Sequence, residues 1–118
     1  MQDGELYAPF GVMGGFMQPQ GHTQVVVNMV DYGMNPQEAL DAGRFYIIDG
    51  QSGGKVWLED EIDVKVMSEL ARMGHEVVPA TGYRRILFGK GQIIHRNPVS
   101  GVLTAGSDPR ADGCAIGW

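Results

Sequence analysis

The sequence predicts a mixed α/β protein of the α+β kind, in which a mainly antiparallel sheet packs with helices. Three observations support this class. Apolar residues recur at helical spacing between Ile62 and Met73. Several short apolar segments later in the chain are separated by Gly, Pro and Asn turns, as neighbouring strands are. No linker or low-complexity tract interrupts the 118 residues, so we expect a single domain over residues 1–118.

The first part of the chain predicts a turn, a strand and two helices. Gln2–Glu5 contains an Asp-Gly pair typical of hairpin turns, and an apolar strand is expected to follow at 6–13. Apolar residues at 20–32 are too dense for a one-sided surface helix, so we expect a buried helix there, ended by Gly33. At 35–42, an N-cap asparagine, a proline at the first helical position and a glutamate at the third predict a short second helix.

The rest of the chain predicts a hairpin, one amphipathic helix and four short strands. Segments 44–48 and 55–58 are strand-like and flank a loop that contains Gly and Ser. The amphipathic helix at 62–73 is expected to carry an i,i+4 ion pair between Glu61 and Lys65. The last four strands are expected at residues 75–78, 85–88, 92–95 and 102–105.

Composition restricts the partners of the chain. Its formal charge is -5 and its Lys and Arg residues are scattered, which disfavours a nucleic-acid surface. No apolar run reaches the length of a membrane span and no export signal is visible at the start, so we expect no membrane association and a cytoplasmic setting. The three histidines match no compact ligand motif and the glycines near Lys90 form no nucleotide-binding fingerprint, so we expect neither a metal nor a cofactor.

The pair Gly14-Gly15 lies between the strand-like segment at 6–13 and the helix-like segment at 20–32. Glycine tolerates positive φ and lets a substrate approach the backbone, and a helix end adds partial positive charge. Such a corner can therefore stabilise an oxyanion with two N–H donors. A Gly-Gly pair after a strand is also a common turn, so the pair alone leaves both interpretations open.

Two long motifs relate the chain to a known family. GVMGGFMQPQGHTQVVVNMVDYGMNPQEALDAGRF near the start and AGSDPRADGCAIGW at the end resemble the C-terminal part of the gamma-glutamyltransferase (gamma-glutamyltranspeptidase) family, over nearly the whole chain. The form GGFMQPQGH is more similar to the acylase-like branch than to the glutathione-processing enzymes. The resemblance implies an N-terminal-nucleophile hydrolase with a four-layer αββα sandwich, of which this chain would be the C-terminal portion of the small subunit.

The resemblance also implies which part of the chemistry this chain contributes. In the family, a precursor cuts itself and the new N-terminal threonine attacks a gamma-glutamyl amide. Thr23, Thr81 and Thr104 do not lie in a segment that resembles the nucleophile motif. Gly14 and Gly15 match the oxyanion-hole glycines of the family. We therefore expect the chain to be inactive alone and to need the nucleophile-bearing remainder of the enzyme, with a gamma-glutamyl or related acyl amide as substrate.

Two arginines have both a functional and a structural interpretation. Arg110 could grip a substrate carboxylate with paired hydrogen bonds. Alternatively, Asp108-Pro109-Arg110 is a structural turn in which Asp108 caps backbone N–H groups and Arg110 forms an internal ion pair. Arg44 resembles the arginine of a Pro-Arg-Phe element of the family. Here Gly43 replaces the proline, which weakens the case for a functional role.

A histidine and the single cysteine are expected to be structural. His22 lies near the start of the buried helix, and we expect it to be a polar cap or a residue of a pocket wall. Cys114 has no neighbouring histidine or second cysteine, which favours a small buried thiol over a nucleophile.

Two functions remain open from the sequence. The chain is either a segment of an acyltransferase or amidohydrolase, or a non-catalytic assembly module or remnant of that family. In both cases the missing layers of the sandwich would expose strand edges and apolar helix faces. We therefore expect the isolated chain to form a homo-oligomer.

Overall fold

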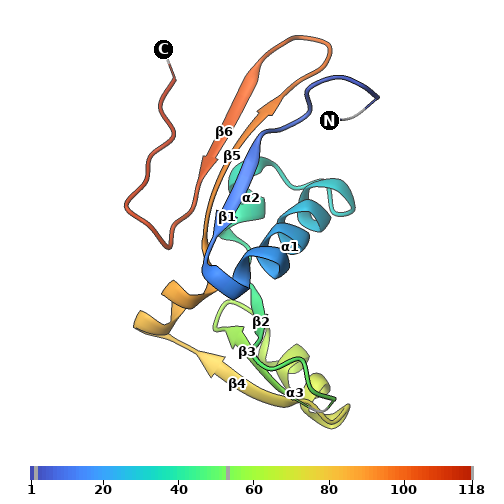
Figure 1. The fold of residues 1–118 in the computed structure, drawn as a ribbon, viewed down its shortest axis with the longest axis vertical. Helices are drawn as coiled ribbons and strands as arrows, with labels where there is room; N and C mark the ends of the chain where they lie inside the picture. The colour runs from blue at the N-terminus through green and yellow to red at the C-terminus, as the bar shows by residue number, and fades with distance from the viewer. Residues whose placement is uncertain (2, 53, 118) are drawn as a thin grey trace. The chain divides into compact units, whose positions relative to one another are not determined.

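The computed structural model describes residues 1, 3–52 and 54–117, and the chain divides into two compact units. The first comprises Met1–Asp41 together with Gly89–Trp118, and the second comprises Ala42–Phe88. Each unit contains a three-stranded sheet and at least one α-helix (Figure 1). The mixed α/β class is thereby confirmed, whereas the single domain over residues 1–118 stays a prediction.

The first unit contains an antiparallel sheet that packs with two α-helices. β5 is the central strand, since β1 and β6 both pair with it in the order β1-β5-β6. Figure 1 shows α1 and α2 beside this sheet. The elements of this unit are β1 Phe10–Met13, the short 3-10 helix η1 Gly15–Met17, α1 Gln18–Val30, α2 Pro36–Asp41, β5 Lys90–Arg96 and β6 Leu103–Ser107.

One face of this sheet packs against the helices, and burial therefore alternates along its central strand. On β5, Gly91 and Ile93 are buried whereas Gln92 and Ile94 are exposed, which is the period of two of a half-buried strand. Ile93 contributes to a core whose members come from β1, α1, α2 and β5, namely Val12, Val25, Met29, Ala39, Leu40 and Ile93.

The described residues of the second unit form a mixed sheet and one α-helix. β2 and β3 form the predicted antiparallel hairpin, and β4 adds to β3 in parallel after the chain crosses over through α3. Three of the four strand pairings among the described residues are thus antiparallel, as expected. The elements are β2 Phe45–Ile47, β3 Lys55–Glu59, α3 Val64–Arg72, β4 Glu76–Ala80 and the 3-10 helix η2 Gly82–Phe88.

Polar side chains cap the N-termini of α2 and α3, and the cap of α2 is the one that the sequence predicts. Asn35 Oδ1 accepts hydrogen bonds from two backbone N–H groups of α2, and Glu38 Oε2 accepts from Asn35 N at 2.9 Å, so the two residues form a capping box. Asp63 Oδ1 accepts from Lys65 N at 2.7 Å and begins α3. The longest helix, α1, has 13 residues, and none of the described helices has the length and apolar character needed to cross a membrane.

One predicted strand and one predicted ion pair are wrong, and one predicted turn is described in part. Residues 85–88 were expected to form a strand but belong to η2, because the segment from Gly82 to Phe88 turns on itself instead of pairing with a neighbouring strand. The predicted pair of Glu61 with Lys65 is wrong because α3 begins only at Val64, and the Glu61 carboxylate pairs with Arg85 instead. Asp3 and Gly4 both adopt positive φ, as an Asp-Gly turn requires, while Gln2 lies outside the described residues.

Candidate functional site

Gly14 and Gly15 form a tight corner between β1 and α1, which we call the glycine corner. Gly14 O accepts a hydrogen bond from Met17 N at 3.0 Å and so begins the one-turn helix η1. Gly15 has a φ of 57°, in the left-handed region that favours glycine. A Cβ on Gly14 would lie 2.9 Å from Gly89 Cα, closer than packed backbone permits. Glycine is therefore favoured at the two positions for different reasons, by close packing at Gly14 and by the positive φ at Gly15.

The backbone donors of the glycine corner are available to a ligand. Among the hydrogen bonds that the described residues make, neither the N–H of Gly14 nor that of Gly15 is a donor. The first N–H groups of a helix have no partner within the helix, and η1 and α1 both start here. A Cβ built on Gly15 would meet no atom within 4 Å, so the space beside this residue is open. The corner can thus present N–H groups to an acceptor atom that approaches from solvent.

His22 connects the two sides of the glycine corner. Its Nε2 accepts a hydrogen bond from Val12 N at 3.3 Å, and its Nδ1 lies 2.6 Å from Gln18 O. The ring also contacts Phe10, with 5.4 Å between ring centroids. His22 also lines a groove with a volume of ≈ 400 Å³. The other residues that line this groove are Gly11, Val12, Met13, Gln18, Lys90 and Gln92. The expectation of a pocket-wall histidine is confirmed.

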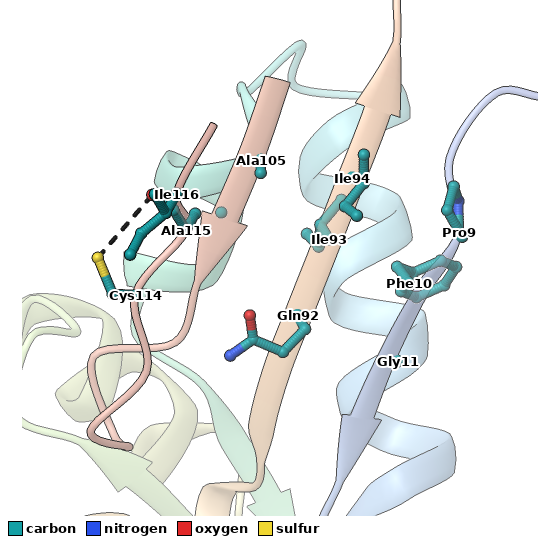
Figure 2. Close-up of a pocket in the computed structure, with 11 residues that line it drawn as sticks. Pro9, Phe10, Gly11, Gln92, Ile93, Ile94, Ala105, Cys114, Ala115 and Ile116 are labelled. Carbon is teal, nitrogen blue, oxygen red and sulfur yellow. Dashed lines mark hydrogen bonds between the residues drawn. The ribbon is translucent and has the colours of Figure 1, made fainter. Parts of the chain in front are cut away.

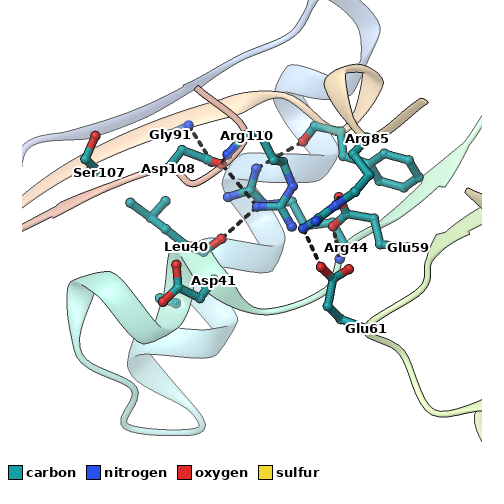
Figure 3. A network of polar contacts seen from close by, with 12 residues as sticks. Leu40, Asp41, Arg44, Glu59, Glu61, Arg85, Gly91, Ser107, Asp108 and Arg110 are labelled. Atoms are coloured by element: carbon teal, nitrogen blue, oxygen red, sulfur yellow. Dashed lines mark hydrogen bonds and ion pairs between the residues drawn. The ribbon is translucent and has the colours of Figure 1, made fainter. Parts of the chain in front are cut away.

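Asp108 and Arg110 form a buried polar cluster in the first unit (Figure 3). Asp108 Oδ2 accepts from Gly91 N at 2.7 Å, and its Oδ1 accepts from Arg110 N at 2.9 Å and from Arg110 Nη1 at 3.1 Å. Arg110 Nη1 also donates to Leu40 O at 2.8 Å, and both charged side chains are at most 1% exposed. This geometry corresponds to the structural interpretation, in which Asp108 caps backbone N–H groups and Arg110 is paired internally.

Arg44 belongs to a polar cluster in the second unit, whose residues are also drawn in Figure 3. Its Nη1 donates to Phe88 O at 3.1 Å, and its backbone N–H donates to Glu59 Oε2 at 2.8 Å. Arg85 bridges two carboxylates, since it pairs with Glu59 Oε1 at 3.4 Å and with Glu61. Arg44 and Glu59 are both buried. Sequence reasoning did not find Glu59, because its partners come from distant parts of the second unit.

Cys114 lies in the wall of a groove on the first unit and is exposed (Figure 2). The expectation of a buried thiol is wrong, because the terminal segment 112–117 is exposed throughout and offers no core position. The groove has a volume of ≈ 520 Å³ and is lined by Phe10, Gln92, Ile94 and Ile116 among others. Within the described parts of the chain, no group of three or more His, Cys, Asp or Glu side chains is arranged to hold a metal ion.

The fold and the glycine corner define a mixed α/β protein with backbone donors where a strand meets a helix. The model of the gamma-glutamyltranspeptidase family matches residues 1–118, and the chain belongs to this family. It is 34% identical to the glutathione hydrolase-like YwrD proenzyme of Bacillus subtilis over 92% of this chain and 21% of that protein. The family resemblance seen in the sequence is thus confirmed.

Solved structures agree with this assignment. The chain is similar to a cephalosporin acylase from Bacillus halodurans, with a TM-score of 0.88 and 44% identity over 98% of this chain and 21% of that one. It also has the fold of part of a gamma-glutamyltranspeptidase from Pseudomonas nitroreducens, with a TM-score of 0.82 and 23% identity over all of this chain and 58% of that one. The chain therefore spans about a fifth of the length of the curated relative above and of the acylase.

Proposed function

We propose that this chain is the C-terminal segment of the small subunit of a gamma-glutamyltranspeptidase-like acyltransferase or amidohydrolase. In this proposal the N–H groups of Gly14 and Gly15 form the oxyanion hole. The observation that carries it is the glycine corner, whose two N–H groups donate no hydrogen bond among the described residues and whose Gly15 faces open space.

The chemistry of amide cleavage explains why such a corner is useful. Attack on an amide carbonyl forms a tetrahedral intermediate with a negatively charged oxygen, and preorganised N–H donors stabilise it. Removal of one such donor typically costs about 3 kcal/mol of barrier lowering. The start of α1 adds the positive end of a helix dipole close to that oxygen.

The substrate class is proposed to be a gamma-glutamyl amide or a related acyl amide. The relatives named above, a glutathione hydrolase-like proenzyme and a cephalosporin acylase, support this class over a purely structural role. Substrate binding by Arg110 stays a prediction. The paired position of Arg110 with Asp108 and Leu40 O supports a role inside the fold.

A complementation experiment tests the proposal. The nucleophilic threonine is proposed to lie on the remainder of the enzyme, so the chain would be mixed with a separately produced threonine-bearing segment and assayed with a gamma-glutamyl anilide. We expect hydrolysis from the assembled complex and none from either part. A well-folded complex without activity would favour the alternative, a non-catalytic assembly module or remnant of the family.

A Gly15→Ala variant of the complex tests the oxyanion hole itself. The added methyl group meets no atom, so the variant should fold with a loss of only about 1 kcal/mol from the left-handed φ. The methyl group would stand beside the proposed oxyanion, and we expect kcat to fall by about a hundredfold.

Gly33→Ala is the matched control, because Gly33 has a φ of 66° and also has open space around its Cβ position. It should show the same small stability loss and nearly full activity. Equal activity of the two variants would exclude the proposed oxyanion hole.

The isolated chain is also proposed to self-associate. The sheet face of the first unit that points away from its helices exposes Met13 and Ile94, which are 62% and 46% exposed. Such apolar surface is usually covered by a partner. Light scattering across micromolar concentrations should show a homo-oligomer, which addition of the threonine-bearing segment dissociates. A monomer over the whole range would contradict this.

A further inference from the structure

The hydrogen bonds of His22 admit only one form of its imidazole ring. A backbone N–H can only donate, so Nε2 must accept the bond from Val12 N. A backbone carbonyl can only accept, so Nδ1 must carry the proton that points to Gln18 O. The neutral tautomer with hydrogen on Nδ1 satisfies both contacts at once. The other neutral tautomer can form neither hydrogen bond. The charged ring has no acceptor for the N–H of Val12.

The N–H of Val12 reaches His22 because of the register between β1 and β5. Pro9 O accepts from Ile94 N at 3.0 Å, and alternate residues of an antiparallel pair share their hydrogen bonds with the partner strand. Val12, opposite Gly91, falls on the other parity, so its N–H points away from β5. His22 thus satisfies a backbone donor at the open edge of the sheet.

The two bonds of His22 enclose the glycine corner. Val12 precedes Gly14 by two residues, and Gln18 follows Gly15 by three. One side chain therefore ties together both ends of the segment that carries the two proposed oxyanion donors. A segment with two adjacent glycines is otherwise costly to hold in one conformation, because glycine has the most backbone freedom to lose.

We propose that His22 is a positioning residue for the reaction: it holds the glycine corner in the geometry that directs the Gly14 and Gly15 N–H groups at the oxyanion. This inference rests on the proposed function of the corner. The ring acts through the backbone, and it transfers no proton in this role.

Nitrogen NMR of the histidine-labelled 118-residue chain tests the geometry without any assay of activity. The protonated and unprotonated nitrogens of a neutral imidazole have well-separated resonances. We expect His22 to show a protonated Nδ1 and an unprotonated Nε2. A protonated Nε2 would overturn the proposal, because Val12 N would then have no acceptor on the ring.

Variants of the assembled complex test the positioning role. His22→Phe keeps the ring and its contact with Phe10 but removes both polar atoms, and we expect kcat to fall about tenfold at nearly unchanged KM, since misplaced donors affect the transition state more than binding. In His22→Gln the amide oxygen can accept from Val12 N and the amide nitrogen can donate to Gln18 O. We therefore expect this variant to recover most of kcat.

Thr23→Val is the matched control. Thr23 Oγ1 donates a hydrogen bond to Pro19 O at 2.9 Å, so this variant also removes a bond from a side chain of α1 to the preceding helical turn. Its kcat should stay within about twofold of the parent. If Gly15→Ala lowers kcat but His22→Phe does not, the positioning role fails and the oxyanion hole stands. If neither variant lowers kcat, the proposed function itself fails.

Discussion

An Asp108→Ala variant is expected to lose about 3–5 kcal/mol of folding free energy, because it removes one partner of a buried ion pair. Asp108 is fully buried and accepts hydrogen bonds from Gly91 N, from Arg110 N and from the Arg110 guanidinium. Without the carboxylate, a guanidinium that is 1% exposed would lose the negative charge of Asp108, and the Gly91 N–H on the central strand would lose its acceptor. Chemical denaturation of the parent and the variant measures this difference.

Glu38→Ala is a matched control for the loss of Asp108. Glu38 also accepts a hydrogen bond from a backbone N–H, that of Asn35 at 2.9 Å, but it is exposed. Its loss should cost about 1 kcal/mol or less. Equal losses of folding free energy in the two variants would show that the buried Asp108 pair stabilises the fold no more than an exposed helix cap does. That result would reopen the alternative in which Arg110 grips a substrate carboxylate.

Local signals in the sequence were sufficient for most elements of the fold. The capping box at Asn35, the Asp-Gly turn and the spacing of apolar residues act within a few positions of the chain, so they predict helices and hairpins without knowledge of distant partners. The parallel pairing of β3 with β4 could not be predicted in this way, because it depends on how the α3 crossover returns the chain. The strand predicted at residues 85–88 was wrong, because a short apolar run is compatible with both a strand and a 3-10 helix.

The candidate site was predictable only in part, for a similar reason. Gly14 and Gly15 were identified because glycine pairs and the family motif are visible along the chain. The role of His22 was not visible, because its bond to Val12 exists only when the β1–β5 register turns that N–H outwards. Glu59 and its arginine partners were missed because a buried charge network joins residues that are far apart in sequence.

A Gly106→Ala variant is expected to lose about 3 kcal/mol or more of folding free energy, because the added methyl group would collide with the first turn of α2. Its Cβ would lie 2.7 Å from Pro36 C, 2.8 Å from Pro36 O and 2.9 Å from Gln37 N. These are backbone atoms, so no side-chain rotation relieves the contact. The Gln37 side chain also bonds the backbone of Ser107 in both directions, at 3.0 and 2.9 Å, which holds α2 against the end of β6.

Gly11→Ala separates this collision from the general effect of alanine in a strand. Gly11 lies in the same sheet as Gly106, and a Cβ there would come no closer than 4.0 Å to its nearest neighbour, His22 Nε2. We expect a change within about 1 kcal/mol, in the stabilising direction, because alanine reduces the freedom of the unfolded chain. Urea midpoints of the two variants should therefore move in opposite directions. A urea midpoint that rises in both variants would mean that α2 can move away from β6 at little cost. The sheet of the first unit would then tolerate a gap where the structure shows close packing.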